Sequence, residues 1–304
     1  MKQSLCRHLL GCAVTTALVV SAMLGTVVTT SADGKQSGPL RILLTNDDGW
    51  NAVGITAVYD ALVAAGYDVT VVAPLTNQSG VGGRITFGGP PLQVVLQALR
   101  KYSVAGSPAD AVEVGLSVVF ANKPPDLVIS GTNVGQNVGA ATVHSGTVGA
   151  AVTALNDGVP AIAVSTEIDF ATNVGPFAET SAFVVKLVAA LRKQTQGSQL
   201  LPEAVGLNVN YPLLEGGGAP TDVVLTQNGR GFLDLTYTGA LPTTVGESSA
   251  LTIGLNLAVP ESEEHADTAA LAANMVSIST LEPDYDAASD VHESIRKIVE
   301  ELKD

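Results

Sequence analysis

Two adjacent carboxylates, Asp47 and Asp48, lie just beyond an apolar run that ends at Leu44. That run has the length and composition of a strand buried in a parallel sheet, and Asn46 and Gly49 flank the acidic pair. Carboxylates this close repel each other, so such a site commonly holds a cation or a shared proton. A divalent ion with oxygen ligands is the simplest neutraliser, although the same residue types also favour a plain turn followed by a helix N-cap.

Two further oxygen donors follow predicted strands in the same half of the chain. Ser79 comes after a strand predicted over residues 68–73, and Asn133 comes after one predicted over residues 126–129. The carboxyl ends of parallel strands share one edge of a sheet, so both side chains are expected to meet the acidic pair there. Two carboxylates, a hydroxyl and an amide suit Mg²⁺, Mn²⁺ or Ca²⁺. The structural alternative is that Ser79 is a turn residue and that Asn133 only satisfies loop backbone groups.

A third candidate group, Ser145, Gly146 and Thr147, opens a predicted helix of small residues. Backbone N–H groups at a helix N-terminus bind anions, and a divalent ion beside such a site is the equipment of phosphomonoester hydrolysis. Ser145 is equally compatible with a plain helix cap. The preceding His144 suits either a phosphate donor or general acid, or a histidine that faces solvent.

Two arginines in glycine-rich segments, Arg84 and Arg230, are weaker candidates for steering a phosphate group.

The elements that must position these residues alternate between strand and helix patterns in the first half of the chain. They predict an α/β fold: a Rossmann-like, mostly parallel sheet with helices on both faces, followed by a C-terminal extension of hairpins and a terminal helix. No G-x-G-x-x-G follows the first strand, which speaks against a dinucleotide site. Helices are predicted over residues 54–66, 109–120, 144–156, 177–194 and 289–303, and strands over residues 40–44, 68–73, 92–104, 126–129, 161–165, 205–209, 223–225, 251–259 and 275–279.

The first 32 residues form a separate segment. Lys2, Arg7 and His8 precede an uncharged run, and small residues up to Ala32 follow it, which predicts a signal peptide over residues 1–32 and a polar linker over 33–38. We therefore expect a secreted or periplasmic protein; the alternative is an uncleaved membrane anchor, because the run is about long enough to span a bilayer. Both cysteines of the chain lie in this leader, so no thiol chemistry is expected in the mature protein.

Composition and charge narrow the classes of partner. Hydrophobic residues make up 46% of the chain and aromatic residues only 4%, so the core must be built mainly from aliphatic side chains. The formal net charge of −14 argues against nucleic-acid polymers and anionic membranes as partners. A small anionic substrate would need a local positive centre, and a bound metal ion supplies one.

Several ordered motifs resemble the SurE survival-protein family of metal-dependent 5′/3′-nucleotidases and phosphatases. The resemblance extends from about Leu40 to Asp286 and implies a SurE-like domain over residues 39–286, irregular from about 197, with a C-terminal helix over 287–304. The motifs are RILLTNDDG at 41–49, VVAPxxNQSG at 71–80, GSPADAV at 106–112, PDLVISGTNVGQN at 125–137 and HSGTVGAA at 144–151, with weaker matches at 207–212 and 276–281.

The resemblance implies roles for particular residues. The family's metal ligands fall on Asp47, Asp48, Ser79 and Asn133, its phosphate loop falls on Ser145, Gly146 and Thr147, and the Asn of its Asn-Asp-Asp motif falls on Asn46. The implied activity is metal-dependent hydrolysis of nucleoside monophosphates and other small phosphate esters, with Asn46, Asp47 and Asp48 as catalytic residues. The implied assembly is a homodimer or homotetramer. The alternative is a non-catalytic protein that binds phosphate or nucleotides on the same fold.

Overall fold

The computed structural model describes residues 38–195, 199–214, 216–284, 295–296 and 299, which belong to one compact unit that begins at Lys35. The predicted leader (1–32), almost all of the linker (33–38) and most of the C-terminal helix (287–304) lie outside these described residues. Within them, no helix combines the length and the apolar character needed to cross a bilayer.

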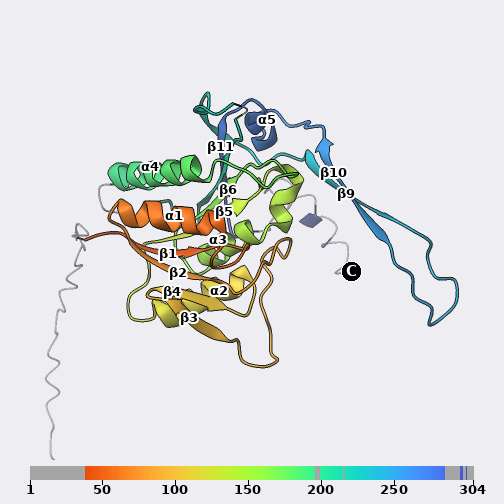
Figure 1. Cartoon of the computed structure of the whole chain (residues 1–304), viewed down its shortest axis with the longest axis horizontal. Helices are drawn as coiled ribbons and strands as arrows, with labels where there is room; N and C mark the ends of the chain where they lie inside the picture. Colours follow the sequence, from red (N-terminus) through yellow and green to blue (C-terminus); the bar gives the residue numbers. More distant parts are fainter. Residues whose placement is uncertain (1–37, 196–198, 215, 285–294, 297–298, 300–304) are drawn as a thin grey trace, which may run out of the picture. The chain divides into compact units, whose positions relative to one another are not determined.

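A mixed sheet organises the described part of the chain (Figure 1), with nine strands in the order β3-β4-β2-β1-β5-β6-β7-β11-β8. The six neighbouring strands from β4 to β7 run parallel, while β3 and β11 are antiparallel to β4 and β7. This confirms the prediction of a mostly parallel sheet. The strands are β1 (Arg41–Thr45), β2 (Asp68–Pro74), β3 (Val94–Ala98), β4 (Lys101–Val104), β5 (Leu127–Val134), β6 (Ala161–Thr166), β7 (Gly206–Tyr211), β8 (Val223–Thr226) and β11 (Val276–Leu281).

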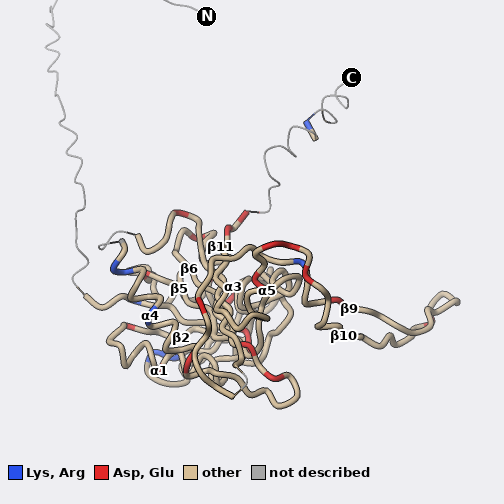
Figure 2. Tube along the Cα trace, turned by 90° about the horizontal axis from the view of Figure 1, so that it is seen from above, with Lys and Arg blue, Asp and Glu red and all other residues tan. Residues whose placement is uncertain are grey.

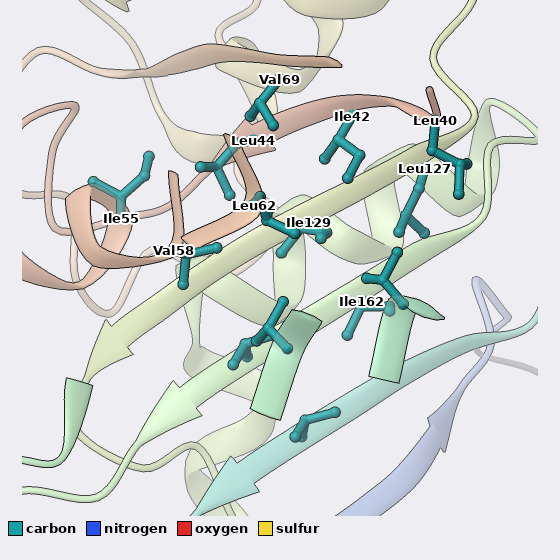
Figure 3. Close-up of a cluster of buried hydrophobic side chains, with 14 of the residues drawn as sticks. Leu40, Ile42, Leu44, Ile55, Val58, Leu62, Val69, Leu127, Ile129 and Ile162 are labelled. Atoms are coloured by element: carbon teal, nitrogen blue, oxygen red, sulfur yellow. The ribbon is translucent and has the colours of Figure 1, made fainter. Parts of the chain in front are cut away.

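Helices cover both faces of the sheet, as the buried apolar strands require. On one face α1 (Val53–Ala64) and α4 (Phe177–Thr195) pack over the strands, and on the other face lie α2 (Pro108–Val114) and α3 (Gly146–Asn156). Figure 3 shows the first of these layers, in which α1 places three apolar side chains against the central strands. Its labelled members include Ile55, Val58 and Leu62 from α1 and Ile42, Leu44, Ile129 and Ile162 from the strands, all of them 0% or 1% exposed.

Two of these helices, α2 and α3, begin where the sequence provides a cap. At α2, the Ser107 side chain accepts a hydrogen bond from the Asp110 backbone N–H at 3.1 Å, and Asp110 accepts one from the Ser107 N–H at 2.8 Å, which is a capping box with Pro108 in the first turn. At α3, Ser145 Oγ accepts a hydrogen bond from the Val148 N–H at 3.1 Å. A single π-helical turn, η1 (Gly115–Val119), continues α2.

The C-terminal half contributes strands to the main sheet and also builds a separate hairpin. Strands β9 (Phe232–Thr238) and β10 (Thr252–Val259) pair with each other in a two-stranded sheet that projects from the rest of the unit (Figures 1 and 2). The predicted extension of hairpins is therefore confirmed. The sequence analysis missed β9, the short helix α5 (Asp267–Ala272) and the 3₁₀ turn η2 (Gly139–His144). α5 and η2 have six residues each and are too short to show a clear periodicity, whereas β9 carries an Asp and two Thr among its apolar residues.

One strand is longer than the sequence predicted. We expected a strand over residues 126–129 followed by a loop from Ser130 to Asn133, but β5 continues to Val134. Its pairing with β6 shifts register between Ser130 and Asn133, so polar residues and a glycine are accommodated inside the sheet. Gly and Asn are poor strand formers, and tertiary pairing overrides that preference here.

Candidate metal and phosphate site

The strands that carry the predicted ligands are neighbours in the sheet. β1 lies between β2 and β5, and all three run parallel, so the residues that follow β1 and β2 meet the end of β5 at one edge. The chain passes from β1 outward to β2 and later returns to the other side of β1. Such a reversal of strand order is where open α/β sheets bind their ligands.

Asp47 is buried at this edge and faces the beginning of α3. Asp47 is only 3% exposed, and its Oδ1 accepts a hydrogen bond from Thr147 Oγ1 at 2.6 Å. Burial raises the pKa of the Asp47 carboxyl, while hydrogen bonds from the Thr147 side chain and from the Thr147 and Gly146 backbone oppose that shift. The first turn of α3 therefore stabilises the ionised form of a carboxylate that its burial disfavours.

Asp48 points toward β5 and is half-buried. Its Oδ2 accepts a hydrogen bond from the Val134 backbone N–H at 3.0 Å. Burial, followed by the negative charge of Asp47, raises the pKa of Asp48 to about 7. None of the ion pairs in the described part of the chain involves Asp47 or Asp48, so the two carboxylates are close together without a protein cation.

Glycine at position 146 is required for the approach of Asp47 to α3. A Cβ atom added to Gly146 would lie 2.8 Å from the Asp47 Cβ and 3.1 Å from the Pro108 Cγ. Both distances are shorter than ordinary carbon contacts, so a side chain here would push Asp47 away from the helix. The predicted phosphate loop thus also sets the position of the predicted metal ligand.

Asn133 lies in β5 and is 8% exposed. Its Nδ2 donates a hydrogen bond to the Gly135 carbonyl at 2.7 Å, which orients the amide. Within the described residues no hydrogen-bond donor contacts the Asn133 Oδ1, so this oxygen retains its capacity to bind a cation. The strand that carries Asn133 also holds Asp48, because the backbone N–H of Val134, the next residue, donates to the Asp48 carboxylate.

Ser79 is exposed and lies on a loop that is held against the same edge. The Gln78 backbone N–H donates to the Asp47 carbonyl at 2.7 Å, and the Gly82 N–H donates to the His144 carbonyl at 3.0 Å. These bonds connect the loop after β2 with the ends of β1 and η2. The Ser79 hydroxyl forms no hydrogen bond with the described residues, whereas its backbone N–H donates to Asn77 Oδ1 at 2.8 Å.

Asn46 is fully buried, and its side chain is paired with its own turn. Asn46 Nδ2 donates to the Gly49 carbonyl at 3.0 Å, and Asn46 Oδ1 accepts from the Gly49 N–H at 3.3 Å. Gly49 has a φ of +113°, which suits glycine. The structure therefore shows Asn46 shaping the loop that carries Asp47 and Asp48, and its predicted contact with phosphate stays a prediction.

The side chains of the predicted phosphate loop are already engaged. Ser145 Oγ caps α3, and Thr147 Oγ1 binds Asp47, so both hydroxyls have structural partners. What remains for a phosphate is the positive end of α3 itself. His144 is exposed next to this end, and its carbonyl accepts the Gly82 hydrogen bond described above.

The donor set fits a hard divalent cation. Two carboxylates without a protein cation, an amide oxygen without a hydrogen bond and a free hydroxyl converge on one edge of the sheet, and all of them are oxygen donors. No group of three His, Cys, Asp or Glu side chains suited to a metal occurs among the described residues, so a site here depends on the amide and the hydroxyl. That composition favours Mg²⁺, Mn²⁺ or Ca²⁺ over Zn²⁺.

Sequence reasoning missed one residue that supports this edge. Asp267, at the start of α5, is fully buried and accepts hydrogen bonds from the Gly139 N–H at 3.1 Å and the Gly229 N–H at 2.9 Å. It thereby anchors the C-terminal part of the chain to η2, the turn that leads to His144 and Ser145. An isolated Asp before a short apolar segment carries no sequence signal for such a contact.

Two cavities in the described part of the chain lie elsewhere. One of about 420 Å³ lies between the loop that follows β7 and α5, and one of about 500 Å³ lies between α4 and the strands β7, β8 and β11. None of the predicted site residues lines either of them.

The raised pKa of Asp48 predicts a pH dependence of stability in the absence of a divalent ion. The folded chain keeps a proton on Asp48 up to about pH 7, whereas an unfolded Asp loses it near 3.8. The folded state therefore binds more protons in this interval, and the free energy of unfolding should fall as the pH rises through it. The test is the difference in Tm between about pH 5 and about pH 8, in EDTA, for the wild type and for Asp48→Asn. The variant cannot ionise at this position, and an equal difference in both proteins would contradict the prediction.

Comparison with known proteins shows that the chain is similar to SurE proteins. A family described as Survival protein SurE matches residues 42–233. A protein named 5′-nucleotidase SurE from Methanocella arvoryzae is 43% identical over 204 residues, which cover 64% of this chain and 74% of that protein. Another of the same name from Solidesulfovibrio magneticus is 43% identical over 175 residues, which cover 57% of this chain and 65% of that protein.

A solved structure agrees in fold. The crystal structure of a SurE protein from Aquifex aeolicus superposes with a TM-score of 0.70 at 32% sequence identity. The match covers 87% of this chain and 100% of that chain, so it includes the C-terminal extension as well as the parallel core.

Proposed function

Because the chain belongs to the SurE survival-protein family, we propose that it is a metal-dependent phosphomonoesterase that hydrolyses nucleoside monophosphates and other small phosphate esters. The observation that carries the proposal is the pair Asp47 and Asp48, which lies without a protein cation beside the N-terminus of α3. The relatives from Methanocella arvoryzae and Solidesulfovibrio magneticus are named 5′-nucleotidases, which supports nucleotides as the substrate class.

The proposed metal ligands are Asp47, Asp48, Ser79 and Asn133. When bound, a divalent ion such as Mg²⁺ or Mn²⁺ polarises the phosphoryl oxygens and acidifies the attacking water. The chain's part is to keep these ligands in place. Thr147 holds the Asp47 carboxylate, the Gly135 carbonyl orients the Asn133 amide, and Asn46 shapes the turn that carries the acidic pair. Such fixed side chains avoid reorganisation during the reaction.

The phosphate is proposed to bind at the N-terminus of α3, where Ser145, Gly146 and Thr147 begin the helix. The backbone N–H groups and the positive end of the helix favour the negative charge that the transition state carries. Gly146 leaves room for a close approach, because a Cβ there would already crowd Asp47. The substrate would then lie between the helix terminus and the carboxylate pair.

A substrate and metal panel tests this function. Phosphate release from AMP should occur with Mg²⁺ or Mn²⁺ and should fall by about 10²-fold or more in excess EDTA, because the carboxylate pair cannot act on an anionic ester without a cation. Adding the divalent ion back should restore the activity, which separates loss of metal from loss of fold. Calcium belongs in the same panel because it prefers similar oxygen ligands.

Binding of AMP without any phosphate release, under all metal conditions, would instead support the alternative of a non-catalytic nucleotide-binding protein.

Assembly and location are proposed on separate grounds. The β9–β10 hairpin exposes apolar side chains, including Tyr237, Ile253 and Leu255, which are 60%, 64% and 59% exposed, and this supports a homodimer or homotetramer. Light scattering after chromatography measures the oligomeric state directly, and a monomer would refute the proposed assembly.

Secretion after cleavage of the predicted leader, and the domain limits given above, rest on the sequence pattern alone. N-terminal sequencing of the exported protein tests the cleavage.

A further inference from the structure

Arg84 lies on the loop after β2, and two independent sets of contacts place its backbone beside the candidate site. On one side, Gln78 of the same loop binds the Asp47 carbonyl through its N–H at 2.7 Å. On the other side, the Arg84 carbonyl accepts a hydrogen bond from Ser107 Oγ, next to Pro108, which borders Gly146. The loop around Arg84 thus bridges the strand end that carries Asp47 and the start of α2.

Thr86, two residues after Arg84, strengthens this attachment of the loop. The Thr86 N–H and the Thr86 hydroxyl both donate to the Asp110 carboxylate at 2.8 Å. Backbone hydrogen bonds from Thr86 and Ser107 and side-chain hydrogen bonds from the same two residues outweigh burial and lower the pKa of Asp110, so it stays ionised over the working pH range. The Arg84 backbone is consequently held on both sides, and its side chain projects from a defined point.

The Arg84 guanidinium carries a charge that no carboxylate balances within the described residues. Its Nη2 donates to the neutral Gln78 Oε1 at 3.0 Å, which turns the cation back toward the loop that binds Asp47. In contrast, Arg41, Arg100 and Arg230 each form an ion pair with an Asp or a Glu. The chain as a whole has a net charge of −14, and Figure 2 shows Lys and Arg as a few isolated positions. The Arg84 guanidinium is therefore available to an anionic ligand.

The depth of Arg84 indicates which part of a substrate it contacts. Asp47, Asn133 and Ser145 are 3%, 8% and 6% exposed, whereas Arg84 is exposed. A phosphoryl group that reacts at the buried residues leaves the remainder of its substrate at the rim, where Arg84 lies. A guanidinium binds a phosphate in a bidentate manner, and the opposite charges strengthen these hydrogen bonds. The anionic group that it would recognise at the rim is therefore a second phosphate.

We propose that Arg84 is a specificity-determining residue that binds a second, non-reacting phosphate group of the substrate. Nucleotides with two separate phosphates are then preferred over monophosphates. This inference rests on the proposed function, because it assigns the reacting phosphate to the buried site. It concerns binding in the ground state, so it acts on KM more than on kcat.

The test compares two substrates that differ by one phosphate, AMP and adenosine 3′,5′-bisphosphate. In Arg84→Gln, the KM for the bisphosphate should rise about tenfold, the KM for AMP should rise by no more than about threefold, and kcat should stay within about twofold. Arg84→Lys keeps the charge and should recover part of the preference. Lys193→Gln is the matched control: it removes one exposed charge in the last turn of α4, which leads to the opposite edge of the sheet.

Calorimetry provides a readout that does not depend on turnover. In EDTA, binding of adenosine 3′,5′-bisphosphate to the full chain should weaken in Arg84→Gln and not in Lys193→Gln. An unchanged ratio of the two KM values in Arg84→Gln, or unchanged binding, would overturn the role of Arg84. If no phosphate is released from either substrate, the proposed function fails instead, and the calorimetric comparison still decides whether Arg84 binds the second phosphate.

Discussion

Replacing Asp47 by Asn is expected to reduce kcat/KM for AMP hydrolysis by about 10³-fold or more while the chain remains folded. The substitution removes the charge of the most buried proposed metal ligand but keeps its shape. The amide oxygen can still accept the hydrogen bond from Thr147 Oγ1, which is 2.6 Å from the carboxylate in the wild type. The loss is therefore attributed to cation binding and not to packing.

Three measurements on the same sample separate these causes. Phosphate release gives the activity, calorimetry with Mg²⁺ or Mn²⁺ gives the loss of metal binding, and thermal unfolding in EDTA gives the stability. Because burial raises the pKa of Asp47, the neutral variant should be at least as stable as the wild type at neutral pH without metal. Asp60→Asn, which removes an exposed carboxylate from α1, is the matched control and should leave activity unchanged. Full activity of Asp47→Asn would rule out the proposed metal site.

Replacing Gly54 by Ala should produce the largest loss of stability, about 3 kcal/mol or more in the free energy of unfolding. Gly54 lies in the first turn of α1 and is buried against β5. A Cβ at this position would overlap the carbonyl oxygen of Thr132, which is backbone and cannot rotate away. The helix or the strand would have to move, and Asn133, the next residue of that strand, would move with it. We therefore expect weaker metal binding as well.

Helix propensity by itself predicts the opposite sign, because Ala favours a helix over Gly by about 1 kcal/mol. Urea unfolding of Gly54→Ala and Gly38→Ala distinguishes the two effects. Gly38 has no heavy atom within 4 Å of an added Cβ and no positive φ, so its substitution should change stability little. A Gly54→Ala protein as stable as the wild type would show that α1 can separate from β5 at small energetic expense.

The arrangement of the three ligand-bearing segments could be predicted because it depends only on strand order and direction. The strands before Asp47, Ser79 and Asn133 were recognisable from apolar runs, and parallel strands bring their carboxyl ends to one edge. The prediction that Asn133 lies in a loop was wrong, since β5 continues to Val134. The strand nevertheless meets the end of β1 at this point, because Val134, the residue after Asn133, holds Asp48.

Side-chain partners could not be predicted to the same degree. Ser145 and Thr147 were expected to form part of a phosphate loop, with a helix cap as the alternative for Ser145. In the structure the Ser145 hydroxyl caps α3 and the Thr147 hydroxyl holds Asp47. Each of these hydrogen bonds satisfies a buried polar group, and the order of residues along the chain does not reveal such a pairing. Hydrogen bonds such as Asp267 to Gly139 join residues 128 positions apart and leave no local signal.

The amino-acid sequence by itself determined the class of fold and the chemistry of the donors, because periodicity and residue type are local properties. Only the tertiary structure decided which donors are buried, which are paired and which remain free. The raised pKa of Asp48, the crowding at Gly54 and Gly146 and the unbalanced charge of Arg84 all arise from neighbours distant in the chain. Burial and electrostatic interactions depend on distance in space, and distance along the chain does not specify them.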